Sequence, residues 1–200
     1  METFVNRFVE YAEIVFYIMF ISALMVITAV PIFTIGAAVT SAYKVFLSLP
    51  EYDNSMSLKD MLKKYFRYFI KKLLPTSTIT LWFIVMIYSC YKMISLVRMN
   101  SIIMAVIFFL FFEMILLFQI IFIIHAEIEN IKYFDAIINA FLVTHRFLFY
   151  VIAMVLIQVV LISLIFISPW TIILMPGLSI FINTKIFKSK IKPRGLSLFI

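Results

Sequence analysis

Long apolar runs, separated by short segments that carry most of the charge, dominate the pattern along the chain. A membrane-spanning helix needs about 20 predominantly apolar residues. Runs of this kind predict spans over residues 14–35, 73–91, 101–124, 147–168 and 169–187, the last of them shorter and interrupted by Pro176 and Gly177. The pattern therefore predicts an all-α integral membrane protein with about five transmembrane helices in one domain, 1–200.

The segment between the first two spans, residues 44–72, predicts an amphipathic helix. Ser57 and Asp60 have the spacing of a capping box, and apolar residues recur after them at helical spacing. The remaining positions form a basic patch that we expect to face anionic lipid headgroups at the inner leaflet: Lys59, Lys63, Lys64, Arg67, Lys71 and Lys72. A docking face for a soluble partner is the alternative interpretation.

The segment between the third and fourth spans, residues 125–146, predicts a second amphipathic helix. Its apolar residues recur three and four positions apart and comprise Ile128, Ile131, Phe134, Ile138, Phe141 and Leu142. We expect this helix to lie against the inner membrane surface or to pack on the helix bundle.

The distribution of Lys and Arg predicts an orientation. Fourteen of the 17 basic residues fall in the cytoplasmic links 44–72 and 125–146 and in the stretch from Lys185 through the basic tail, 188–200. Because cytoplasmic loops carry the excess of Lys and Arg, these three segments should share the inner side. This predicts an outer N-terminus, a cytoplasmic C-terminus and an odd number of spans, which supports counting 169–187 as a fifth.

Composition narrows the classes of function. The chain is 65% hydrophobic and 14% charged, against about 25% charged in soluble domains. Its net charge of +7 arises beside apolar runs, so membrane lipids are the expected partner and nucleic acid is not. The single cysteine, Cys90, excludes an intrachain disulfide and a cysteine-built metal site.

Motifs of catalytic or cofactor sites are missing from the sequence. His125 and His145 flank the inner link, but the His-Glu-x-x-His spacing of zinc enzymes is absent, and no phosphate-binding or nucleophile-elbow motif occurs. We therefore expect no enzyme activity, no metal and no cofactor.

Two helix breaks recur in the first and last spans. Pro31 precedes Gly36, and Pro176 precedes Gly177; in each case a lysine follows eight residues after the glycine. Proline removes a backbone donor, and the freed carbonyls need partners from neighbouring helices or water. The two segments predict a parallel repeat of broken helices, which either bind an ion or substrate or are inert kinks.

Glu113 is the one acidic residue inside a predicted span, near the middle of 101–124. A carboxyl group at that depth is costly unless it has a partner, and its own helical face offers none. Gln158 lies at a similar predicted depth, so we expect Glu113 and Gln158 to face each other or a shared cavity, together with Ser22. The pair is either a polar site for an ion, proton or substrate, or a hydrogen bond between helices.

The order of these features resembles the YesL-like family of small bacterial membrane proteins. The resemblance rests on the stretch from Pro31 to Phe46, the aromatic and basic stretch from Tyr65 to Lys72, the segment from Asn139 to Arg146, and the last span ending in Lys185-Ile-Phe187. The family's small-residue run after the first proline is shifted here. The resemblance implies a plasma-membrane protein of unknown activity associated with carbohydrate uptake, and it defines no site residues.

Two functional hypotheses follow. The first is an accessory or assembly partner of a carbohydrate transport system in the bacterial cytoplasmic membrane, contacting transporter subunits through its cytoplasmic helices. The second is a permease or channel-like subunit with a polar site around Glu113 and Gln158. A polar cavity reaching Glu113 favours the second, whereas a dry bundle with an apolar groove elsewhere favours the first.

Overall fold

The chain is helical throughout the part that the structure describes. The computed structural model describes residues 2–49, 56–96 and 101–195, and in these ranges it is 91% helix with no strand. Four helical segments are long and apolar enough to cross a membrane: Tyr11–Thr28, Leu58–Ile94, Ser101–Glu127 and Leu148–Ile167. The all-α class and the presence of several potential membrane helices are therefore confirmed.

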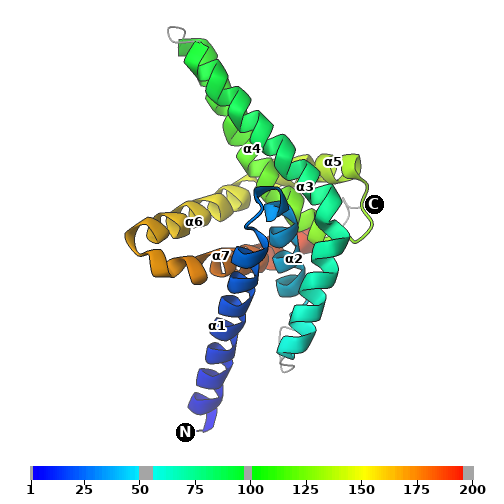
Figure 1. The fold of residues 1–200 in the computed structure, drawn as a ribbon, viewed down its shortest axis with the longest axis vertical. Coiled ribbons are helices and arrows are strands. Elements are labelled where there is room, and N and C mark those ends of the chain that lie inside the picture. Colours follow the sequence, from blue (N-terminus) through cyan, green and yellow to red (C-terminus); the bar gives the residue numbers. More distant parts are fainter. Residues whose placement is uncertain (1, 50–55, 97–100, 196–200) are drawn as a thin grey trace.

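Eleven helical elements follow one another in the described ranges (Figure 1). In chain order they are α1 (Glu2–Thr28), η1 (Ile32–Thr34), α2 (Ile35–Leu47), α3 (Leu58–Leu96), α4 (Ser101–Glu127), α5 (Tyr133–Arg146), α6 (Leu148–Ile167), η2 (Pro169–Ile173), α7 (Met175–Ile186), the π-helical turn η3 (Phe187–Ile191) and α8 (Lys192–Gly195).

The second, third and fourth predicted spans coincide with long helices. The first, 14–35, does so only as far as Thr28, beyond which lie η1 and the start of α2, and the fifth does not. Residues 169–187 form the 3₁₀ turn η2 and the 12-residue helix α7. At 1.5 Å per residue α7 is about 18 Å long, while the hydrocarbon core of a bilayer is about 30 Å thick. α7 is too short to cross as one helix, so the fifth span stays a prediction.

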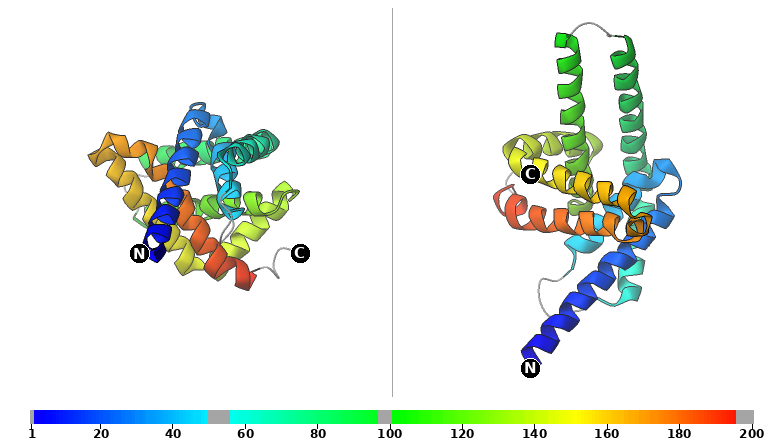
Figure 2. Two further views of the ribbon diagram at one scale, coloured as in Figure 1. Left: turned by 90° about the horizontal axis from the view of Figure 1, so that it is seen from below. Right: turned by 90° about the vertical axis from the view of Figure 1, so that its left-hand side faces the viewer.

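The predicted amphipathic helix of the first link and the second span are one continuous helix. α3 contains 39 residues and is therefore about 58 Å long. Figure 2 shows its second half beside α4, the two forming a hairpin that projects from the rest of the molecule. The rings of Phe83 and Phe118 stack between them at a centroid distance of 3.8 Å. The basic half of α3 is thus an extension of a long apolar helix.

Two other hairpins are built alike, each from a long helix and a short one. α1 is followed by η1 and the short helix α2, and α6 is followed by η2 and the short helix α7. In each case a proline stands at the turn, Pro31 before η1 and Pro169 at the start of η2. The predicted repeat therefore consists of two units, each a long helix, a 3₁₀ turn and a short helix.

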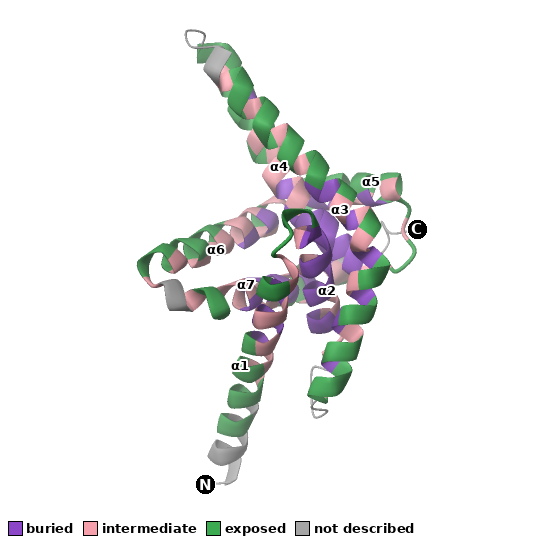
Figure 3. Ribbon diagram, viewed as in Figure 1, coloured by how far each residue is buried: buried purple, intermediate pink, exposed green. Residues whose placement is uncertain are grey.

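α2 lies at the centre of the molecule, where the hairpins meet (Figure 3). Nine of its thirteen residues are buried, and several are small, which lets neighbouring helices approach closely. The outer parts of α1, α3, α4 and α6 are exposed and apolar instead. The fold is a packed centre from which apolar helices extend in different directions.

α5 packs on the bundle, the second of the two positions expected for the inner link. Its small residues Ala136 and Ala140 are buried, together with Val143 and Thr144. Of the large apolar residues predicted to line one face, Phe134, Ile138, Phe141 and Leu142 are exposed, Phe134 at 76%, whereas Ile128 and Ile131 precede α5 and are partly buried against the core. Small residues allow close contact with α4, so the predicted apolar face points outward, where lipid or another protein can cover it.

Candidate functional site

Glu113 is paired with His145, which comes from another helix. Glu113 Oε2 on α4 is 3.6 Å from His145 Nε2 on α5, and Nδ1 of the same ring is 3.0 Å from the carbonyl oxygen of Phe141. The carboxyl side chain is 20% exposed and the imidazole 45%. The pair is an ionic bond only when His145 is protonated; otherwise a neutral imidazole contacts the carboxyl group.

The expected pairing of Glu113 with Gln158 is replaced by this contact. Among the described residues no hydrogen bond joins the two side chains, and Gln158 lies partly exposed on α6. The prediction assumed that α6 starts at the inner membrane boundary. Because α5 doubles back to bring His145 level with Glu113, α6 starts near that level, and Gln158 is ten residues, or about 15 Å, further along.

Ser22 serves the contact between the two hairpins. Its hydroxyl accepts a hydrogen bond of 3.1 Å from the backbone N–H of Gly177, at the start of α7. This N–H belongs to the first turn of a helix, where no intrahelical acceptor exists. Ser22 therefore joins α1 to α7 and does not contribute to the surroundings of Glu113 that we had expected.

Both break glycines lie where another helix approaches too closely for a side chain. A Cβ on Gly36 would contact Thr80 Oγ1 and lie 2.6 Å from the carbonyl oxygen of Thr76. A Cβ on Gly177 would lie 2.5 Å from the carbonyl oxygen of Ile18. Pro31 and Pro176 stand beside these contacts, at the N-cap of η1 and in the first turn of α7. At the glycine of each predicted break, another helix therefore passes in close contact with the backbone.

A buried polar cluster lies between three helices, formed by Tyr43, Gln119 and Asn183. Gln119 Nε2 on α4 donates a hydrogen bond of 2.7 Å to the hydroxyl of Tyr43 on α2. The amide of Asn183 on α7 lies beside that hydroxyl, and Tyr43 and Asn183 are both fully buried. The two amide atoms of Asn183 have no hydrogen-bond partner in the protein. Buried amides without partners are costly, so this position suits water or a small polar ligand.

This cluster was not predicted from the sequence. Gln119 is a polar residue inside the predicted third span, as Glu113 is, and its position alone could have singled it out. Tyr43 directly precedes Lys44, and Asn183 lies two residues before Lys185, the other repeated lysine. Only the packing of α2 against α7 brings these two positions together.

Charged residues from four elements converge on the segment that follows α4. The Glu129 carboxylate lies 3.5 Å from Lys44 Nζ and 3.4 Å from Lys71 Nζ, while Lys72 Nζ donates to the Glu129 carbonyl oxygen at 2.8 Å. Two residues earlier, the Glu127 carboxylate lies 2.6 Å from Lys192 Nζ on α8. We call these six residues the charged cluster. Cations suit this place because the C-terminus of a helix carries partial negative charge.

The pKa of Glu129 reflects these contacts. The adjacent hydroxyl of Tyr68 and then the ammonium group of Lys44 stabilise the carboxylate, and together with Lys71 they lower its pKa to about 2. A carboxyl group with a depressed pKa stabilises the folded state at neutral pH and loses that effect in acid. As an anion, Glu129 therefore joins the last turn of α2 and an interior part of α3 to the segment that follows α4.

The residues of the predicted basic patch lie in different surroundings in the structure. Lys59, Lys63 and Arg67 are exposed, Lys64 is partly exposed, and Lys71 pairs with Glu129. Lys72 is only 4% exposed, so its placement on the lipid-facing side was wrong. Met61, Tyr65, Tyr68 and Lys72 follow one another at spacings of four and three, and this stripe faces the protein.

His125 is the other buried residue that could carry chemistry. It is 1% exposed near the end of α4, and neither ring nitrogen has a hydrogen-bond partner. Within the described residues there is no group of three or more His, Cys, Asp or Glu side chains placed to hold a metal ion. The arrangement supports binding or packing of polar groups.

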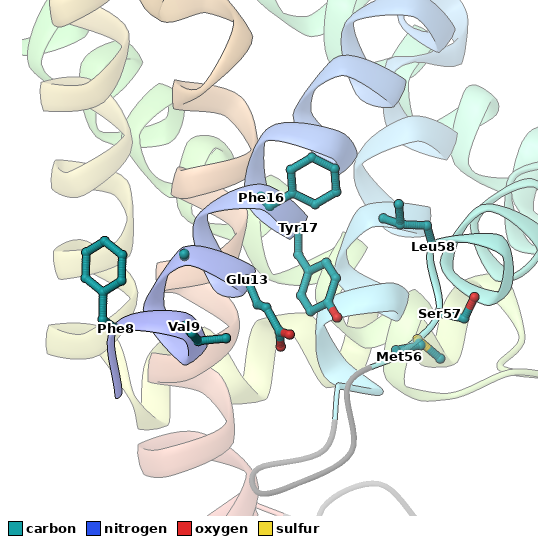
Figure 4. A pocket seen from close by; sticks show the side chains of 9 residues that line it. Phe8, Val9, Glu13, Phe16, Tyr17, Met56, Ser57 and Leu58 are labelled. Atoms are coloured by element: carbon teal, nitrogen blue, oxygen red, sulfur yellow. The ribbon is translucent and has the colours of Figure 1, made fainter. Parts of the chain in front are cut away.

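A shallow apolar groove of about 490 Å³ lies away from these polar groups, between α1 and the start of α3 (Figure 4). Tyr17 reaches from α1 toward Leu58, and the carboxyl group of Glu13 lies at the same opening. The groove is lined by Phe8, Val9, Ala12, Glu13, Phe16, Tyr17, Met56, Ser57 and Leu58. It presents apolar side chains at the surface, next to exposed apolar residues of α1.

Comparison of the chain with protein-family models, with curated proteins and with solved structures found no match. The resemblance to the YesL-like family stays an expectation.

Proposed function

We propose that this chain is a multi-pass protein of the bacterial cytoplasmic membrane and acts as an accessory or assembly partner of a carbohydrate transport system. One observation carries the proposal: the apolar helices bury little of their surface against one another. In the apolar windows of α1 and α6, 22% and 11% of the residues are buried inside the chain. Helices that extend separately from a small packed centre leave long apolar faces for another membrane protein.

The groove between α1 and α3 supports the same proposal. Phe8, Val9 and Phe16 are exposed along it, while Glu113, the buried polar cluster and the charged cluster lie elsewhere. An apolar groove apart from Glu113 is the feature that we expected of an accessory subunit. The resemblance to the YesL-like family suggests a carbohydrate importer as the system served.

We further propose that the link 44–72, the link 125–146 and the tail face the cytoplasm, with anionic lipid headgroups next to their exposed cations. Contacts within the charged cluster join all three segments, which supports placing them on one side. Their excess of Lys and Arg supports the inner side.

Affinity purification from membranes tests the accessory role. The chain with an affinity tag is solubilised in a mild detergent and its co-purifying proteins are identified. We expect subunits of an importer to be recovered, and we expect recovery to fall several-fold when Phe8 and Phe16 in the groove are changed to Ser. A parallel variant replaces Phe149 and Phe166 on α6, each 86% exposed against 67% for Phe8 and 53% for Phe16, and shows whether the face of α6 contributes to the same contact. Purification of the chain alone or with copies of itself contradicts the proposal.

A permease or channel-like subunit is the alternative function, and the buried polar cluster favours it. Tyr43, Gln119 and Asn183 would contact the transported solute, because Asn183 has unpaired donor and acceptor atoms. Uptake by cells carrying Asn183→Leu or Tyr43→Phe distinguishes the two functions. Under the accessory role, any loss of uptake follows the amount of folded protein. A permease loses uptake at normal protein levels.

A further inference from the structure

We propose that the N-terminus lies on the same side of the membrane as the basic segments. In this arrangement α1–α2 is a re-entrant hairpin, α3 and α4 are the two full crossings, and α6–α7 lies across them without reaching the far side (Figures 1 and 2). The inference replaces the outer N-terminus and five spans expected from the sequence. It does not depend on the proposed function, since it follows from the directions of the helices alone.

α1 runs in the same direction as the first half of α3. Tyr17 and Leu58 line the same groove, and further along both helices the hydroxyls of Thr28 and Tyr65 are 2.7 Å apart. A rising residue number on α1 therefore corresponds to a rising number on α3. The first half of α1 and the start of α3 lie at the same end of the molecule (Figure 1).

α2 runs in the opposite direction. Its first turn, at Gly36, contacts Thr76 and Thr80 of α3, whereas Lys44 in its last turn lies 4.8 Å from the ring of Tyr68. A rising number on α2 thus corresponds to a falling number on α3. α1 and α2 are antiparallel, and the chain returns after η1 to the end from which it started.

The short helices limit how far the hairpins reach. α2 has 13 residues and α7 has 12, which makes them about 20 Å and 18 Å long. The last turn of α2 contributes Lys44 to the charged cluster, and the chain after α7 contributes Lys192. Measured from this cluster, neither hairpin turn reaches across an apolar layer of about 30 Å.

α3 and α4 do reach across it. From Lys72 in the charged cluster, α3 continues for 24 residues to Leu96, or about 36 Å, and α4 returns over 27 residues. The end of α3 at Leu96 and the start of α4 at Ser101 then lie on the far side.

The charge distribution agrees with this arrangement better than with the five-span one. Of the 17 Lys and Arg residues, only Lys92, near the end of α3, and Arg98, between α3 and α4 in the sequence, fall on the far side, while Arg7 joins the basic side. Irregular backbone at membrane depth needs partners for its polar groups within the protein. At the turn of η1 the Thr34 hydroxyl donates to the Thr28 carbonyl at 2.5 Å and the Thr34 backbone N–H to the Pro31 carbonyl at 2.8 Å, while Val30, Ile32 and Phe33 present exposed apolar side chains.

Cysteine accessibility tests the inference. The native cysteine is removed by Cys90→Ser, and single cysteines are introduced at four described positions: Ala12, Ser57, Ser101 and Ser168. Intact and permeabilised cells are treated with a membrane-impermeant maleimide. We expect A12C to behave as S57C, with labelling only after permeabilisation, and S101C to label in intact cells. S168C, in the turn of the second hairpin, should stay unlabelled from outside.

A cross-link provides a second measurement that does not rely on labelling of intact cells. Ala12 and Ser57 line one groove, so the double variant A12C/S57C should be joined by a short bis-maleimide in membranes, and A12C/S101C should not. Labelling of A12C or S168C in intact cells to the level of S101C would overturn the proposal, as would failure of the A12C/S57C cross-link. Neither result bears on whether the chain assists a transporter.

Discussion

Gly36 and Gly177 show most directly how single residues set this fold. Each lies at the start of a short helix, where the backbone of a neighbouring helix occupies the position that a side chain would need. The sequence marked both as helix breaks next to proline, and the structure shows that their main role is close approach. The distinction matters because a break tolerates alanine, whereas a close crossing does not.

Replacement of either glycine by alanine should destabilise the protein by about 1–3 kcal/mol, the usual cost of overpacking. For Gly36→Ala, adding Thr80→Ala should restore part of the loss, since the Thr80 hydroxyl is one of the atoms that the new methyl group meets. No side-chain change can relieve Gly177→Ala of its contact with the Ile18 carbonyl. Thermal unfolding in detergent measures all three variants. Unchanged stability of G177A would show that the helices do not approach this closely.

Polar residues within the apolar helices were only partly predictable. Glu113 stood out because a carboxyl group in a span needs a partner. The identity of that partner, His145, depended on α5 doubling back, and no spacing along the sequence encodes that turn. Gln119 and Asn183 were overlooked although they are buried. Depth counted along a sequence fails where a helix does not start at the membrane boundary.

At the scale of elements, Glu129 joins helices that are distant along the chain. Lys44 and Lys71 belong to different helices, and both contact its carboxylate. Because Glu129 is about half exposed, solvent weakens each pair, and the group of contacts together contributes about 1 kcal/mol.

Glu129→Gln should therefore lower the melting temperature at pH 7 by about 2–4 °C. The pKa of Glu129 is about 2 when folded, against 4.5 for the free side chain. A depressed carboxyl pKa stabilises the fold above pH 4.5, and this contribution disappears as the pH falls toward 2. The difference between wild type and E129Q should accordingly shrink over that interval. Melting curves in detergent at several pH values measure it, and a constant difference would contradict the assignment.

The helices themselves were more predictable than their packing faces. Apolar runs located α1, α3, α4 and α6 because a long apolar run in a helix needs few other conditions. For α5, the hydrophobic pattern predicted the helix correctly and its buried face incorrectly, since Ala136 and Ala140 are buried and Phe134 is exposed. Large apolar residues identify the buried face in water. In a membrane they also face lipid, so small residues are the better indicator there.

At the scale of the whole molecule, long apolar helices extend from a small packed centre that contains buried polar groups. Composition established that much of the chain needs an apolar environment, and the distribution of Lys and Arg grouped three segments that the charged cluster joins in the structure. The reversal after α6 agrees with the boundary predicted between spans 147–168 and 169–187, whereas the reversal after α1 was not predicted, because residues 14–35 were expected to form one span. Proline and glycine at these points are compatible with either a kink or a turn, and tertiary contacts decide between them.

The mass of the particle released from native membranes tests the central claim most directly. Membranes containing the tagged chain are solubilised under mild conditions, and native mass spectrometry records the intact assembly. A partner protein should cover the exposed apolar arms, so we expect a particle heavier than the 23.5 kDa chain that contains transporter subunits and dissociates when Phe8 and Phe16 are replaced. A particle of one chain with bound lipid, or of identical chains alone, would contradict the account.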